Sequence, residues 1–223
     1  MTRLLVHVEG QTEETFVNEI LAPHLYDVGY QSVGARLLGN ARLRFQRGGI
    51  KSWEVVRQEI QRHLASDVGC IATTMVDYYA LPGNWPGRTT ASSLPYAERG
   101  DHLRQELAKD FTTSSAYGQR FEPFVLMHEF EALLFSDCER FAAGVGEPDK
   151  ANAFQIIRNQ FSCPEEINDS PHTAPSKRVA SILPGYQKPL LGNLAAIEVG
   201  LTRIRDECPH FAAWLGRLEA RVA

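Results

Sequence analysis

The chain has 223 residues, of which 43% are hydrophobic and 22% are charged, ordinary values for a globular protein with one core or a core and a small appendage. Its net charge of −4 gives no overall basic field of the kind that marks many nucleic-acid-binding proteins. The four cysteines form no CxxC pair, which argues against a disulfide framework and a zinc ribbon. No apolar stretch suits a signal peptide or a membrane span, so we expect a cytoplasmic protein with no membrane partner.

The first predicted elements are a buried strand over 3–9 and a helix over 12–25, whose apolar residues recur at helical spacing. The strand stops at Glu9-Gly10. Glycine there permits a sharp turn and a close approach of a ligand to the backbone. A carboxylate at that position can coordinate Mg²⁺ or act as a general acid or base. Pro23 should end or bend the helix.

Glu13 and Glu14 follow at the start of this helix. Acidic side chains are favourable there because the helix dipole places partial positive charge at its N-terminus. We therefore interpret these two glutamates as helix-start residues and reserve a functional role for Glu9.

Further along the chain we expect one or two short strands within 33–45, a helix over 52–66, a strand over 68–76, a loop over 78–97, a helix around 103–111 and a strand over 123–128. The strand over 68–76 stops at an acid, Asp77, as the first strand stops at Glu9. The loop is long for a compact domain, which indicates function or disorder. Its Tyr78, Tyr79 and Trp85 argue against disorder alone.

The composition changes near 144–148, where we place a boundary between a core of residues 1–143 and a helical subdomain of residues 144–223. The helices expected in the second part are 150–161, 175–183, 192–206 and 209–221. Strands that alternate with helices predict a three-layer α/β core with a mostly parallel sheet, followed by a helical C-terminal extension.

Ligands of parallel α/β sheets bind beyond the carboxyl ends of the strands. Glu9 and Asp77 each follow a strand directly, and Glu129 and Glu131 follow the third strand. If the strands are neighbours, these carboxylates converge on one edge and form a cation site in outline. Residues two apart on a helix diverge by about 200°, so only one of Glu129 and Glu131 should face the site.

Two stretches without acids carry the basic side chains that could meet phosphate. The first contains Arg36, Arg42, Arg44, Arg47 and Lys51, and the second contains Lys177, Arg178 and Lys188. Arginine forks match phosphate oxygens well. Chance clustering on a solvated surface is the alternative for the first stretch.

The segment "APSKRV" at 174–179 is the best candidate for anion binding. Pro175 suits the first helical position, which places Lys177 and Arg178 in the first turn. The helix dipole disfavours cations there, unless an anion lies between them and the free backbone N–H groups. A solvated helix end is the alternative.

The segments "VHVEGQTEETF", "TTMVDYYALPG", "HEFEALLFSD" and "TAPSKR", in this order, resemble the Toprim-related bacterial proteins grouped as domain of unknown function 4276. The resemblance covers nearly the whole chain. It assigns Glu9 the role of the glutamate after the first strand and Asp77 that of the first aspartate of an Asp-x-Asp pair. Tyr79 stands where the second aspartate should be. Glu131 or Glu129 could replace it, and related nucleases favour Glu131.

The resemblance implies a Mg²⁺- or Mn²⁺-dependent nuclease acting on DNA or RNA, in a phage-defence setting beside an ABC-class ATPase. The metal would be held by carboxylates from the set Glu9, Asp77, Glu129 and Glu131. Lys177, Arg178 and Lys188 would hold phosphate, with Lys177 assisting catalysis. Tyr79 should line the site without binding the metal, because a phenol is a poor Mg²⁺ ligand at neutral pH.

Two rival hypotheses remain open. The first is a non-catalytic nucleic-acid-binding or regulatory subunit, which the tyrosine at position 79 supports. The second is a nucleotidyl-transfer enzyme on the same fold. A homo-oligomer is compatible with each of them.

Overall fold

The computed structural model describes residues 2–38, 50–167, 170 and 173–222. Its sheet is parallel throughout the described residues and has the strand order β2-β1-β3-β4, with β5 also paired to β3. The strands are β1 (Arg3–Val8), β2 (Ser32–Leu37), β3 (Cys70–Asp77), β4 (Phe121–Glu122) and β5 (Val125–Leu126). The predicted α/β class with a parallel sheet is confirmed.

The helices surround this sheet and then continue as a helical C-terminal region. The α-helices are α1 (Gln11–Phe16), α2 (Ala22–Asp27), α3 (Trp53–Ser66), α4 (Arg88–Ala91), α5 (Tyr96–Ser114), α6 (Cys138–Gly144), α7 (Ala151–Arg158), α8 (Pro175–Ile182), α9 (Lys188–Val199), α10 (Leu201–Glu207) and α11 (Pro209–Glu219). Shorter turns of helix are the π-helix η1 (Val17–Leu21) and the 3₁₀ segments η2 (Tyr78–Ala80), η3 (Gly118–Arg120), η4 (Phe130–Ser136), η5 (Pro148–Lys150) and η6 (Pro164–Glu166).

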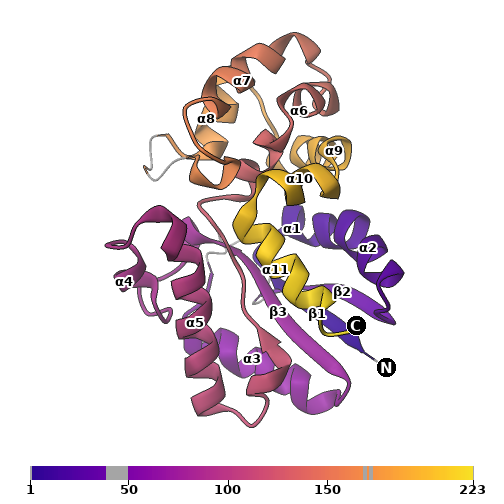
Figure 1. Ribbon diagram of the computed structural model, residues 1–223, viewed down its shortest axis with the longest axis vertical. Helices are drawn as coiled ribbons and strands as arrows, with labels where there is room; N and C mark the ends of the chain where they lie inside the picture. The colour runs from indigo at the N-terminus through magenta and orange to yellow at the C-terminus, as the bar shows by residue number, and fades with distance from the viewer. Residues whose placement is uncertain (1, 39–49, 168–169, 171–172, 223) are drawn as a thin grey trace.

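The sheet is the middle of three layers (Figure 1). Side chains alternate between its faces, as strand geometry requires. Along β3, Ile71 and Met75 join one hydrophobic core with α1, α2 and α11, whereas Ala72 and Val76 join a second core with α3 and α5. Each face of the sheet therefore has its own buried core.

The last helix returns from the helical region to the sheet (Figure 1). Trp214 of α11 stacks on Phe124 with 4.3 Å between ring centroids, and its Nε1–H donates to Thr73 Oγ1 at 2.9 Å. One hydrophobic core thus contains residues from both sides of position 144. The boundary at 144 between two folding units stays a prediction.

The strand predicted over 123–128 is shorter, Val125–Leu126, and a strand not predicted, Phe121–Glu122, precedes Pro123, which has no N–H to donate to a ladder. Two-residue strands lie on either side of it, and both pair with β3. The Thr74 hydroxyl bridges the gap by donating to the Phe124 carbonyl at 2.8 Å and accepting from the Phe124 N–H at 3.0 Å. A threonine side chain thus replaces the missing backbone bonds.

The helix that Pro23 was expected to end or bend continues to Asp27. The π-helical turn η1 comes directly before it, and the Ala22 N–H donates to the Val17 carbonyl, five residues back. Pro23 lies just after this change of register, in the first turn of α2, where the missing N–H of proline disturbs few helical hydrogen bonds.

Other elements follow the predictions with local changes. The helix expected over 192–206 is divided at Gly200, whose φ of +78° no ordinary helix residue adopts. The loop over 78–97 is ordered and contains the short helix α4, with Trp85 buried and bonded to the Lys51 carbonyl at 3.0 Å. None of the described helices is long and apolar enough to cross a membrane.

Candidate functional site

An acidic site lies where the parallel strands end. Glu9 follows β1, Asp77 is the last residue of β3, and these strands are neighbours with Val8 opposite Met75. Glu131 comes from η4, which follows β5 on the other side of β3. Lys188, at the start of α9, reaches these carboxylates from the helical region. The acidic site is defined here as Glu9, Glu13, Asp77, Glu131 and Lys188.

Lys188 links two of the carboxylates. Its Nζ lies 3.3 Å from Asp77 Oδ2 and 3.1 Å from Glu131 Oε2. The other oxygen of Asp77 accepts the Phe130 N–H at 3.0 Å. Asp77 is only 7% exposed and Glu131 is 0% exposed, so the lysine balances charges that water barely reaches. The sequence analysis placed Lys188 on phosphate, whereas in the structure it pairs with acids of the protein.

Glu13 is a helix-start residue, as expected, in the first turn of α1, and it also lies near Asp77 of this site. Its side chain is 3% exposed, and its Oε2 accepts the Gly10 N–H at 3.0 Å. Gly10 has an extended backbone with φ −144°, so no unusual turn requires glycine there. A Cβ at Gly10 would instead lie 3.1 Å from Glu13 Oε2, so glycine lets the Glu13 carboxylate approach the backbone. Glu14 is half-buried, as its helix-start role allows.

Burial and mutual repulsion raise the pKa values of these acids. Burial, then Asp77 and Glu13, raise the pKa of Glu9 to about 8, and burial with Asp77 raises that of Glu13 to about 7. Burial raises the pKa of Glu131 to about 7 and also raises the pKa of Asp77, although Lys188 opposes both shifts. Burial alone would lower the pKa of Lys188, but Asp77 and Glu131 raise it above its usual value. Four acids thus compete for one ammonium group.

Several buried polar atoms at the site have no hydrogen-bond partner among the described residues. They are Glu9 Oε2, Glu131 Oε1 and the Tyr186 hydroxyl. Tyr186 precedes α9, and its hydroxyl would lie 2.8 Å from a Cβ at Gly192. Buried oxygen atoms without partners are costly unless a proton, a water molecule or a cation meets them.

The donor types fit a hard divalent cation, because Mg²⁺ and Mn²⁺ prefer carboxylate oxygens. The buried oxygens of Glu9 and Glu131 that lack a hydrogen-bond partner also favour a cation at this site. Among the residues that the structure describes, however, no three His, Cys, Asp or Glu side chains form a group that could hold a metal ion. The ammonium of Lys188 takes the place between Asp77 and Glu131 where a cation would bind.

Glu129 and Glu131 point to different partners, as their spacing predicts. Glu129 Oε2 accepts the Ser176 N–H at 2.8 Å and so occupies the N-terminus of α8 with a carboxylate of the protein itself. The anion expected at "APSKRV" is therefore supplied from within the chain.

The two cations of α8 lie away from the acidic-site contacts described above. Lys177 is exposed. The Arg178 Nε–H donates to the Thr173 carbonyl at 2.9 Å, and its guanidinium lies 5.3 Å from the centre of the Phe161 ring. Of the first basic stretch, Arg36 pairs with Glu59 at 3.9 Å, whereas Arg42, Arg44 and Arg47 lie outside the described residues.

Tyr79 lies directly after the acidic strand end, in η2. Its ring centre is 5.5 Å from that of His128, and its N–H donates to the His128 carbonyl at 3.2 Å. His128 has a φ of +68°, a left-handed conformation that is rare outside glycine and turns the chain between β5 and η4. Tyr79 is half-buried in this aromatic group, and its role beside the metal stays a prediction.

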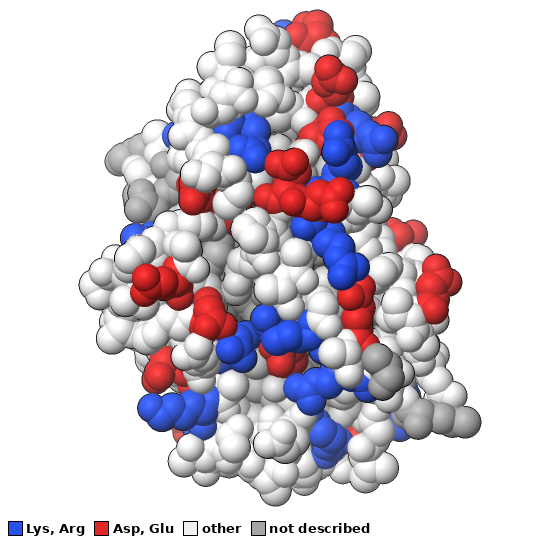
Figure 2. Space-filling view, viewed as in Figure 1, with Lys and Arg blue, Asp and Glu red and all other residues white. Residues whose placement is uncertain are grey.

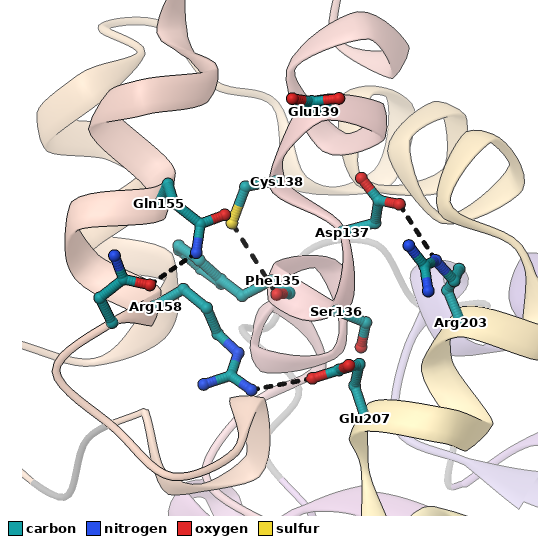
Figure 3. A pocket seen from close by; sticks show the side chains of 10 residues that line it. Phe135, Ser136, Asp137, Cys138, Glu139, Gln155, Arg158, Arg203 and Glu207 are labelled. Carbon is teal, nitrogen blue, oxygen red and sulfur yellow. Dashed lines mark hydrogen bonds and ion pairs between the residues drawn. The ribbon is translucent and has the colours of Figure 1, made fainter.

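A second polar region lies in the helical part, in a cavity of about 470 Å³ between α6, α7 and α10. Figure 3 shows two ion pairs among its charged groups, Arg158 with Glu207 at 2.9 Å and Arg203 with Asp137 at 3.3 Å, and Glu139 apart from both. On the molecular face of Figure 2, acidic and basic side chains likewise lie next to each other over this part. Both arginines of this cavity therefore have a carboxylate partner within it.

The class of protein follows from this architecture: a parallel, three-layer α/β protein with an acidic site at the carboxyl ends of its strands. The chain belongs to the family described as domain of unknown function (DUF4276), whose model matches residues 8–219. Comparisons with curated proteins and with solved structures gave no match.

Proposed function

We propose that this protein is a metal-dependent enzyme that cleaves phosphodiester bonds of nucleic acid, with the acidic site as its active site. The observation that carries the proposal is the gathering of four carboxyl groups, three of them largely buried, around one ammonium at the carboxyl ends of parallel strands. Structural ion pairs do not require such an excess of acids. A divalent cation would use this excess of negative charge, and it would offset the repulsion between the acids and a phosphate.

Glu9 and Asp77 would hold a Mg²⁺ or Mn²⁺ ion, assisted by Glu13 or Glu131. When bound, such an ion lowers the pKa of water and neutralises charge on the phosphate. Glu129 is engaged at the start of α8, which makes it the weaker candidate ligand.

The chain's own residues would supply the remaining chemistry. Burial and the neighbouring acids raise the pKa of Glu9 to about 8, so binding of the cation would release a proton from this carboxyl group near neutral pH. Lys188 holds a positive charge at the site and could turn from Asp77 to a phosphate oxygen. Lys177 and Arg178, with the arginines of the first basic stretch, would contact the nucleic-acid backbone further away.

A second candidate is a non-catalytic nucleic-acid-binding or regulatory subunit that works with an ABC-class ATPase in a defence-type system. The Lys188 ammonium favours it, because a lysine already bound between Asp77 and Glu131 stabilises those carboxylates without a metal. The tyrosine at position 79 also favours a non-catalytic subunit.

One experiment separates the two candidates. The protein is incubated with single-stranded and double-stranded DNA and RNA in Mg²⁺ or Mn²⁺, with and without the product of the neighbouring gene. The enzyme proposal expects cleavage that falls at least about a hundredfold in Glu9→Gln and Asp77→Asn. Glu139→Gln, an exposed glutamate on α6, is the matched control.

Calorimetric titration with Mn²⁺ gives a readout that does not depend on activity. Glu9→Gln and Asp77→Asn should each weaken Mn²⁺ binding, while Glu139→Gln should not. Mn²⁺ binding without cleavage of any nucleic acid would favour the regulatory subunit. Equal Mn²⁺ affinity in all the variants would remove Glu9 and Asp77 from the metal site.

A further inference from the structure

Helix α9 carries three large apolar side chains on its outward side. Leu190, Leu194 and Ile197 are exposed by 58%, 45% and 52%, although leucine and isoleucine are usually buried. Their spacing of four and then three residues places them in one line along the helix. We call this line of side chains the α9 face. Single exposed apolar residues are ordinary, whereas a row of them on one helix suits contact with a partner.

The packing of α9 leaves this face open. The opposite side of the helix is buried and consists mostly of small residues, among them Gly192, Ala195 and Ala196. Helix α6 lies against it at Gly144, where an added Cβ would be 2.7 Å from Ala195 Cα. Small residues therefore hold α9 close to the rest of the molecule, and its larger apolar side chains point away from that contact.

The charges of α9 indicate which partner fits the α9 face. Lys188 and Glu198 are its charged residues, and Lys188 is engaged at the acidic site. Glu198 is exposed in the last turn, where the helix dipole disfavours an acid. Arg140 donates to the Val199 carbonyl at 3.5 Å but pairs with Asp137 at 3.6 Å. The first turn, where an acid is favourable, contains none, and no side chain caps it.

A second copy of α9 in the antiparallel direction meets both needs. It brings each Glu198 to the start of the facing helix, where the dipole favours an acid. A parallel pair would instead bring the two Glu198 side chains together. The spacing of Leu190, Leu194 and Ile197 is also that of the seam along which two helices pack side by side.

We infer that the α9 face is the interface of a homodimer, in which two α9 helices lie antiparallel across a two-fold axis near Leu194. Such an isologous contact uses the same surface of both copies. A helix of 12 residues is about 18 Å long, so the interface is small and a Kd in the micromolar range is expected. Because α9 begins at Lys188, the dimer has one acidic site towards each end of the helix pair.

Analytical ultracentrifugation of the full chain tests this inference, over protein concentrations that span the micromolar range and without metal or nucleic acid. Leu194→Asp brings two carboxylates together at the axis and should weaken dimerisation at least about a hundredfold. Ile197→Asp is a second variant of the same face and should weaken it at least about tenfold. Both positions are exposed, so thermal denaturation should show folded proteins of nearly unchanged stability.

Ile156→Asp is the matched control. Ile156 is 57% exposed on α7, which lies on the other side of α6 from α9 (Figure 1), so this variant should dimerise as the wild type does. Glu198→Gln tests the direction of the helices. It should weaken an antiparallel dimer by about threefold to tenfold, most clearly at low salt, whereas it would strengthen a parallel one.

Loss of the dimer in Leu194→Asp and Ile197→Asp, with the dimer retained in Ile156→Asp, supports the inference. A wild type that stays monomeric, or a dimer that persists in Leu194→Asp, would overturn it. A stronger dimer in Glu198→Gln would overturn the antiparallel arrangement. Protection of α9 from hydrogen exchange only after the product of the neighbouring gene is added would assign the α9 face to that partner instead of a second copy. These results do not depend on the cleavage test at Glu9 and Asp77.

Discussion

In the polar cavity of the helical region each arginine lies against a carboxylate, whereas in the acidic site four carboxyl groups share one ammonium. Both regions are built from the same kinds of side chain. Arg158 also donates to the Phe161 carbonyl at 2.8 Å, and Gln155 donates to Asn159 at 2.7 Å, so polar groups there satisfy one another. The acidic site instead leaves buried oxygens of Glu9 and Glu131 without a partner. A network in which each charged group has a partner stabilises the fold, whereas a buried cluster with more acids than cations indicates a site for a charged ligand.

The largest effect should come from removing the only cation of the acidic site. In Lys188→Met, Asp77 and Glu131 lose their partner inside the protein, and we expect a loss of about 3 kcal/mol in the free energy of unfolding at pH 7.5. This lies at the low end for buried pairs, because about a third of the Lys188 side chain remains in water. Chemical denaturation measures it.

Arg203→Met is the matched change in the polar cavity. Its pair with Asp137 is half-exposed on the arginine side, so its removal should cost less than about 1 kcal/mol. Equal losses in the two variants would show that the two regions do not differ in the way their charges are balanced.

The next largest effect concerns pH. Glu9, Glu13 and Glu131 have folded-state pKa values of about 8, 7 and 7, above the value near 4.3 of an unfolded glutamate. Between the unfolded-state and the folded-state pKa values, the folded state therefore binds more protons than the unfolded state. The stability contributed by these groups rises as pH falls from 9 to 5.5. It is lost as pH rises through 7 and 8.

Glu13→Gln should flatten this rise, because it removes one buried acid and lowers repulsion on Glu9. The change in free energy of unfolding between pH 9 and pH 5.5 should shrink by roughly 2 kcal/mol. If the acidic site binds Mn²⁺, the ion at pH 8 should stabilise the wild type by an amount that grows with the logarithm of its concentration above the Kd. A wild-type protein that loses stability steadily from pH 9 to 5.5 would contradict the pKa assignments.

Much of the fold was predictable from the sequence because its signals are local. The apolar runs at β1 and β3, and helical spacing in α3, α7 and α11, follow from periodicity alone. The gap at Pro123 was readable only in part, since the compensation by Thr74 involves a contact across strands.

The site was predictable where it depends on strand ends. Glu9 and Asp77 follow parallel strands, so their convergence needs only the strand order. The ion pairs of Lys188 with Asp77 and Glu131 were not predicted, because they depend on how α9 packs on the rest of the fold, which no spacing in the sequence encodes. A usable signal for Glu13 was its place one helical turn after Glu9, which keeps it beside the strand end.

The smallest effect should appear at the start of α8, where the protein supplies its own anion. Glu129→Gln retains an oxygen that can accept the Ser176 N–H but loses the negative charge at the helix N-terminus. We expect a loss of about 0.5–1 kcal/mol in the free energy of unfolding. The helix start, with exposed Lys177 one residue beyond Ser176, should then attract anions from solution. Sulfate should stabilise Glu129→Gln more than the wild type in thermal denaturation, with chloride at equal ionic strength as the control. If sulfate stabilises Glu129→Gln and the wild type equally, Glu129 does not exclude external anions from the start of α8. The polar contacts of this helix would then resemble the ion pairs of the polar cavity, which need no external ion.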